Sequence, residues 1–146
     1  MPIIYSFTSA PTRDQLEVVD RVLDEFNMGH EALRDVQRLS VFAEEDQRKI
    51  IGGAVGRTWG ACCELQQLVV RAEHRTRGIG RQLLQRFEQE AAVRGCTLVY
   101  LDTFSFQAPQ FYQQHGYHVA LETRGFTRGV FKYTMQKLLS GPETEP

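Results

Sequence analysis

Residues 68 to 84, LVVRAEHRTRGIGRQLL, constrain the fold of this chain more than any other segment. They predict an apolar strand, then a basic turn with Arg75, Arg77, Gly78 and Gly80, then the start of an amphipathic helix. In such a turn several backbone N–H groups point at one spot, and the positive end of the helix dipole adds to them. The turn therefore predicts an anion site, and a diphosphate suits it best.

The glycines of this turn let an anion approach the backbone closely. A side chain at Gly78 or Gly80 would hold a phosphate away from the amides that must reach it. Arg75, Arg77 and Arg81 add positive charge. An ordinary strand-to-helix turn with solvated arginines is the alternative, and the order of the flanking elements favours the anion site over it.

Neither of two common nucleotide-binding modules matches the turn. A P-loop requires Lys and then Ser or Thr after its last glycine, whereas Gly80 is followed by Arg81 and Gln82. A dinucleotide fingerprint requires a third glycine where this chain has Leu83, although Asp102 could supply its acidic residue. We therefore expect the anion to belong to another kind of ligand.

Composition indicates a small globular protein of one domain. With 146 residues, of which 42% are hydrophobic, the chain can bury a proper core, and we place the domain at 1–139 and a disordered tail at 140–146. A formal net charge of -1 gives no case for nucleic acid as a partner. Because no signal peptide or membrane-spanning run is visible, we expect a cytoplasmic chain with no membrane contact.

The cysteines and histidines do not predict a metal site. Cys62, Cys63 and Cys96 are odd in number and lack a C-x-x-C spacing. Neighbouring residues of a strand point to opposite faces, so Cys62 and Cys63 cannot readily hold one metal ion together. The four histidines are scattered. We expect unreactive thiols and no metal.

The hydrophobic period alternates between strand-like and helix-like values, which predicts one α/β layered structure. Thr12 and Gln15 have capping-box spacing and begin a helix whose apolar stripe runs to Gly29. Further helical segments are expected near 30–36, 78–94 and 109–114. Strands are expected at 3–8, 38–46, 49–59, 61–71, 97–103, 117–123 and 129–137.

Two blocks of the chain resemble one known family. Arg75, Gly78 and Gly80 resemble the acyl-CoA signature of the GNAT superfamily of N-acetyltransferases. Residues 101–117, LDTFSFQAPQFYQQHGY, resemble the later motif of that superfamily, with Ala108, Phe111, Tyr112, Gly116 and Tyr117 on its positions. The resemblance covers most of residues 50 to 137. It implies a mixed central sheet of about six to seven strands with helices on both faces.

The resemblance also implies an enzyme and its cosubstrate. The protein is expected to transfer an acetyl group from acetyl-CoA to a primary amine of a small molecule, by direct attack in a ternary complex. A protein or peptide N-acetyltransferase and a non-catalytic acyl-CoA binding domain are the alternatives. No metal is implied, and the resemblance leaves a homodimer open.

The family motifs assign cofactor contacts to two parts of the chain. Ser105 stands where the family commonly has an Asn that contacts the pantetheine, and a serine has the shorter reach. The remaining contacts lie on the strand and the turn: Leu68, Val69, Val70, Arg75, Thr76, Arg77, Gly78, Ile79, Gly80 and Arg81.

Acetyl transfer to an amine needs a proton acceptor, an oxyanion donor and a proton donor. The resemblance nominates Glu64 as the base, with water oriented by Gln66 or Gln67 as the alternative. It nominates the backbone N–H of Leu68 for the oxyanion, since this strand carries a bulge in the family. Tyr112 takes the position of the tyrosine that protonates the CoA sulfur. The acceptor groove is expected between residues 24–36 and 123–129.

Overall fold

The computed structural model describes residues 1–140, and the tail at 141–146 lies outside the described residues. The chain divides into two compact units, with the boundary between Arg34 and Asp35, and each is described by itself. The prediction of one domain over 1–139 therefore stays a prediction.

The first unit contains one α-helix, α1 (Arg13–Asn27), and the short 3-10 helix η1 (Glu31–Asp35) begins in it. The predicted capping box is confirmed: the Thr12 hydroxyl accepts from the Gln15 backbone N–H at 3.1 Å, and the Gln15 side chain accepts from the Thr12 N–H at 2.9 Å. The strand predicted over 3–8 is wrong. An apolar segment becomes a strand only where another strand pairs with its backbone, and within residues 1–140 none pairs with this one.

The second unit is built on a six-stranded sheet of order β1-β2-β3-β4-β6-β5. Its β3 and β4 pair in parallel and its other neighbours are antiparallel, so the predicted mixed sheet is confirmed. The predicted strand positions from 38 onward hold to within a few residues. The strands are β1 (Gln37–Glu45), β2 (Lys49–Trp59), β3 (Cys62–Val70), β4 (Leu98–Phe104), β5 (His118–Thr123) and β6 (Lys132–Leu138).

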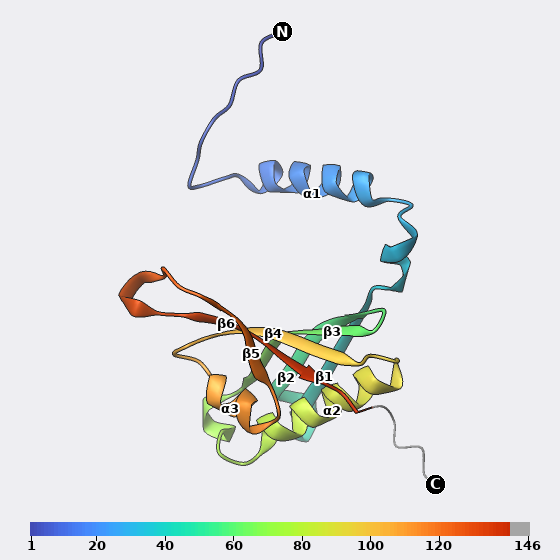
Figure 1. The fold of residues 1–146 in the computed structure, drawn as a ribbon, viewed down its shortest axis with the longest axis vertical. Helices are drawn as coiled ribbons and strands as arrows, with labels where there is room; N and C mark the ends of the chain where they lie inside the picture. Colours follow the sequence, from blue (N-terminus) through green and yellow to red (C-terminus); the bar gives the residue numbers. More distant parts are fainter. Residues whose placement is uncertain (141–146) are drawn as a thin grey trace. The chain divides into compact units, whose positions relative to one another are not determined.

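Two helices, α2 (Ile79–Val93) and α3 (Pro109–Gln114), lie on the same side of this sheet (Figure 1). The inward face of α2 buries Leu83, Phe87 and Ala91 as its helical period predicts. These side chains pack against alternate residues of β3, β4 and β6, which include Leu65, Leu101 and Met135. The core therefore lies between α2 and one face of the sheet, and it fixes where α2 begins.

Candidate active site

Strands β3 and β4 pair over only three residues each and then separate. The parallel pairs are Cys62 with Leu98, Cys63 with Val99 and Glu64 with Tyr100, although both strands continue beyond them. From Leu65 onward, the edge of β3 that faces β4 has no strand partner in the described sheet. The separation leaves backbone N–H and C=O groups free to bond a ligand.

A β-bulge at Gln66 lies where this separation begins. Val55 of β2 pairs with Gln67 and Gly56 pairs with Leu65, so Gln66 is the extra residue of β3. A Cβ atom on Gly56 would lie 1.9 Å from the carbonyl oxygen of Glu64, so only glycine fits opposite the bulge. The bulge that the family resemblance implies for this strand is therefore present.

The turn between β3 and α2 exposes backbone amides at the start of the helix. Gly78 is the N-cap and has a left-handed conformation (φ 77°), which glycine adopts without strain. The first helical hydrogen bond runs from the N–H of Gln82 to the carbonyl of Gly78 at 3.1 Å, so the amides of residues 79–81 have no acceptor within the helix. These amides and the helix dipole favour an anion.

Arginine side chains of this turn are held by local hydrogen bonds. The Arg75 Nε donates to the Val70 carbonyl at 3.1 Å, and the Arg77 Nη1 lies 3.0 Å from the His74 Nδ1. Arg81 projects from the first turn of α2. The positive charges predicted around the anion site are thus present at the turn.

A cavity of about 400 Å³, here called the turn cavity, connects this turn with β3 and α3. A Cβ atom on Gly80 would meet Phe111 and Val70 at 3.8 Å, which is ordinary contact. The protein itself therefore has room for a methyl group at Gly80, so its own packing does not require glycine there. The lining is Leu68, Val69, Val70, His74, Arg75, Thr76, Gly78, Ile79, Gly80, Arg81, Ala108 and Phe111.

A second cavity of about 430 Å³, here called the tyrosine cavity, opens where β3 and β4 separate. It shares Leu68, Val69 and Ala108 with the turn cavity, so the two cavities meet at these residues. Its other lining residues come from β3, β4 and the segment that leads into α3: Leu65, Gln66, Gln67, Asp102, Thr103, Gln107 and Tyr112.

Tyr112 is the buried phenol of this cavity, with 8% of its surface exposed. Its ring packs edge-on against Phe111 at 5.3 Å and Tyr117 at 5.6 Å. Burial raises the pKa of Tyr112 to about 12, because a charged phenolate would lose its hydration. The phenol is therefore protonated at neutral pH and can donate a proton or a hydrogen bond.

The structure does not bring Glu64, Arg77 or Ser105 into the lining of either cavity. Glu64 forms an ion pair with Arg57 (2.8 Å) and lines a different pocket, together with Trp59 and Tyr100. The Ser105 hydroxyl accepts from the backbone N–H of Phe131 at 3.1 Å. By contrast, Leu68 and Tyr112 meet at the tyrosine cavity, and Arg75, Thr76, Gly78 and Gly80 meet at the turn cavity.

Sequence reasoning missed Gln107 and gave Asp102 no role at this site. The side-chain amide oxygen of Gln107 (Oε1) accepts from the backbone N–H of Phe104 at 2.8 Å, which holds this side chain beside the cavity. Asp102 is exposed between the buried Leu101 and Thr103. An acidic residue inside an otherwise apolar strand was the signal that could have identified it.

No cysteine of the described residues lines either cavity. Cys62 is exposed and Cys63 is buried, as expected for neighbours on a strand, and neither they nor Cys96 line the cavities. Within residues 1–140 there is no group of three His, Cys, Asp or Glu side chains that could hold a metal ion. In the same part of the chain, no helix is both long and apolar enough to cross a membrane.

Known proteins with related sequences and structures are acetyltransferases. The family model described as acetyltransferase (GNAT) domain matches residues 37–119. Blasticidin-S acetyltransferase of Streptomyces morookaense is 30% identical over 107 residues, which are 73% of this chain and 79% of the relative. An acetyltransferase of Agrobacterium fabrum is 32% identical over 92 residues, which are 63% of this chain and 67% of the relative.

A solved structure shows the same relationship over almost the whole chain. The crystal structure of an acetyltransferase from Bacillus cereus is similar with a TM-score of 0.73 and 29% identity, and the match covers 92% of this chain and 98% of that one. With the family match over both motif blocks, this chain belongs to the GNAT family of acetyltransferases and is an acetyl-CoA-dependent acyltransferase.

Proposed function

We propose that the protein transfers the acetyl group of acetyl-CoA to a primary amine of a small molecule, by direct attack of the amine on the thioester. The observation that carries this proposal is the junction of the two cavities at Leu68, Val69 and Ala108. A ligand whose diphosphate binds the turn can extend along β3 and place its acyl group beside Tyr112.

The cofactor is held mainly by the backbone in this proposal. The amides of Ile79, Gly80 and Arg81 receive the diphosphate, and the Arg75 and Arg81 side chains, which line the turn cavity, add charge beside them. The unpaired edge of β3 at Leu68 to Val70 bonds the pantetheine arm. The pantetheine arm contains amide groups like those of a protein backbone. They can therefore form hydrogen bonds with the N–H and C=O groups of β3 that no neighbouring strand binds.

Tyr112 and the backbone of Leu68 supply the chemistry at the thioester. The Leu68 N–H stabilises the negative charge that develops on the carbonyl oxygen. The buried Tyr112 phenol keeps its proton at neutral pH and gives it to the leaving thiolate. The C–N bond forms as the C–S bond breaks. The nitrogen of the arriving ammonium loses two protons: one restores the proton of the Tyr112 phenol, and the other passes to solvent.

Direct attack in a ternary complex is supported by the lining of the tyrosine cavity. A covalent acyl-enzyme would require a nucleophilic side chain such as a thiolate at the thioester. No cysteine of the described residues lines this cavity. Burial raises the pKa of the Cys63 thiol to about 12, so this thiol is a poor nucleophile as well. The lack of a thiol at this cavity supports attack by the amine itself.

A small-molecule acceptor is supported by the relative named blasticidin-S acetyltransferase, which aligns with 73% of this chain. The tyrosine cavity, at about 430 Å³, has the size of a small-molecule site. Function in the cytoplasm and a homodimeric state stay predictions.

The test is a thiol-release assay with acetyl-CoA and a panel of acceptors. The panel contains amino acids, polyamines, aminoglycosides, aminoacyl nucleosides and short peptides. The proposal expects release of free CoA with a small amine and a product whose mass is increased by one acetyl group. Turnover restricted to peptides would replace it by peptide N-acetylation. Acetyl-CoA binding without turnover of any amine would instead support a binding domain.

A further inference from the structure

We propose that Asp102 binds the cationic amino group of the acceptor, so the enzyme selects amines that carry a positive charge when they arrive. This inference rests on the proposed function, because it concerns the acceptor of the same cavity. Asp102 is the only charged side chain among the described residues that line the tyrosine cavity. A primary alkylamine has a pKa near 10 and arrives as an ammonium ion, which such a cavity attracts.

The position of Asp102 separates the acceptor from the cofactor. Side chains of a strand alternate between its faces, and Leu101 and Thr103 point into the core beneath α2. Asp102 therefore lies on the opposite face of β4, while α2 and the turn cavity lie on the core face. An amine that reaches Asp102 enters the tyrosine cavity from the face opposite α2, as a ternary complex requires.

The Asp102 side chain is oriented but retains binding capacity. Asp102 and Thr134 are direct partners across β4 and β6, and the Thr134 hydroxyl donates to the Asp102 Oδ1. Among the described residues the Thr134 hydroxyl is the hydrogen-bond partner of this carboxylate, and no ion pair involves it. A carboxylate has about four acceptor positions, so the others can receive N–H groups of an ammonium.

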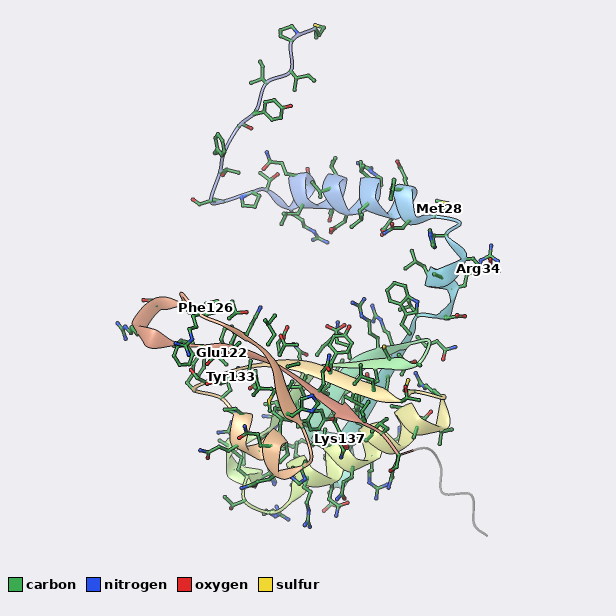
Figure 2. All side chains as sticks on the ribbon, viewed as in Figure 1. Met28, Arg34, Glu122, Phe126, Tyr133 and Lys137 are labelled. Atoms are coloured by element: carbon green, nitrogen blue, oxygen red, sulfur yellow. The ribbon has the colours of Figure 1, made fainter. Side chains whose placement is uncertain are left out.

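A cluster of aromatic side chains begins at Phe104, close to Asp102 on β4. Phe104 is two residues further along β4 and therefore on the same face. Its ring stacks on Phe106 at 5.7 Å and meets Phe126 edge-on at 5.3 Å. Figure 2 shows Phe126 on the segment that joins β5 to β6, the 123–129 loop expected to border the acceptor. Aromatic faces attract cations, so this cluster favours the approach of an ammonium ion to this face of β4.

The contrast with Glu64 sharpens the assignment. Glu64 is already neutralised by Arg57 at 2.8 Å and lines a different pocket. Asp102 has no ion-pair partner within residues 1–140 and lines the pocket of Tyr112. The inference therefore expects that removing the charge of Asp102 weakens binding of the amine and that removing the charge of Glu64 does not.

The experiment compares Asp102→Asn and Glu64→Gln, with Asp46→Asn in the exposed turn after β1 as the control for loss of one charge. For an amine from the panel, Asp102→Asn should raise the KM for the amine by about tenfold or more, because a charged hydrogen bond is lost. The KM for acetyl-CoA should change less than about twofold. For an acceptor that is uncharged at neutral pH, such as aniline, the same variant should raise the KM much less.

A binding measurement separates this inference from the proposed function. The CoA-saturated protein is titrated with butylammonium and with the neutral 1-butanol, and binding is followed by NMR shifts of the tyrosine-cavity residues. Preference for butylammonium in the wild type and its loss in Asp102→Asn would support the inference even if no amine were turned over. Three results would overturn it: equal binding of both probes by the wild type, an unchanged preference for butylammonium in Asp102→Asn, or loss of that preference only in Glu64→Gln.

Discussion

The turn cavity takes most of its lining from one continuous stretch of chain, residues 68–81, and its ligand-facing groups are largely backbone amides. The tyrosine cavity takes its lining from three separated stretches, 65–69, 102–103 and 107–112, and here polar side chains such as Asp102, Gln107 and Tyr112 join the backbone of β3. A site built from local backbone follows directly from a short sequence pattern. A site built from side chains that are distant in the sequence forms only after tertiary packing, here where β3 and β4 separate.

The largest expected effect concerns Tyr112, the buried side chain of the tyrosine cavity. Tyr112→Phe should lower kcat by about 100-fold or more, because general acid catalysis contributes that much. The Kd of acetyl-CoA should change less than about threefold, since the ring and its packing remain. Steady-state kinetics and calorimetric titration measure the two quantities. Loss of acetyl-CoA affinity in parallel with kcat would contradict the claim that Tyr112 acts in the chemical step while the turn cavity binds the cofactor.

The next effect concerns the turn cavity. Gly80→Glu places a carboxylate beside the expected diphosphate and should weaken acetyl-CoA binding by about 100-fold, or about 2.7 kcal/mol. Gln85→Glu, which adds the same charge at an exposed position of α2, is the control and should bind normally. Calorimetry with acetyl-CoA decides the matter. Intact binding by Gly80→Glu would mean that the anion site lies elsewhere.

A smaller effect concerns the ion pair that joins α2 to β6. Glu88 of α2 is buried and accepts from the Lys137 Nζ of β6 at 2.7 and 3.1 Å, and β6 also carries Thr134 (Figure 2 labels Lys137). Lys137→Met leaves a buried carboxylate without its partner and should lower the free energy of unfolding by about 2 kcal/mol.

Urea unfolding of Lys137→Met and of the double variant with Glu88→Gln tests this link. The double variant should recover part of the lost stability, because it removes the uncompensated charge. Identical losses in the single and double variants would contradict a specific coupling between α2 and β6.

The smallest effect is the alkaline pH dependence of stability. The pKa of Tyr112 is about 12 in the folded protein and near 10 when unfolded, so the phenol must be kept neutral to stay buried. Its contribution is complete below pH 10 and is lost as the pH rises toward 12. Between pH 9 and 11 the wild type should lose about 1.4 kcal/mol more than Tyr112→Phe. Parallel pH profiles of the two proteins would place this phenol in water.

The same contrast explains how much was predictable from the sequence. The strand, glycine turn and helix at 68–84 form from local signals, and the structure has them where the sequence predicts. The strand at 3–8 needed a pairing partner, which no local pattern guarantees. Glu64 was nominated by its family position alone, and its ion pair with Arg57 appears only once β2 and β3 are paired. Asp102 lines the tyrosine cavity because β3 and β4 separate beyond Glu64 and Tyr100, and this separation is a tertiary feature that no local pattern predicts.

The central claim is that acetyl transfer takes place beside Tyr112, where the turn cavity and the tyrosine cavity meet. An isotope-filtered NOE experiment with acetyl-CoA labelled with carbon-13 in the acetyl methyl group tests it most directly. The account predicts cross-peaks from the methyl group to the Tyr112 ring and the Leu68 side chain. Cross-peaks to the rings of Tyr100 and Trp59, which line the Glu64 pocket, would contradict it.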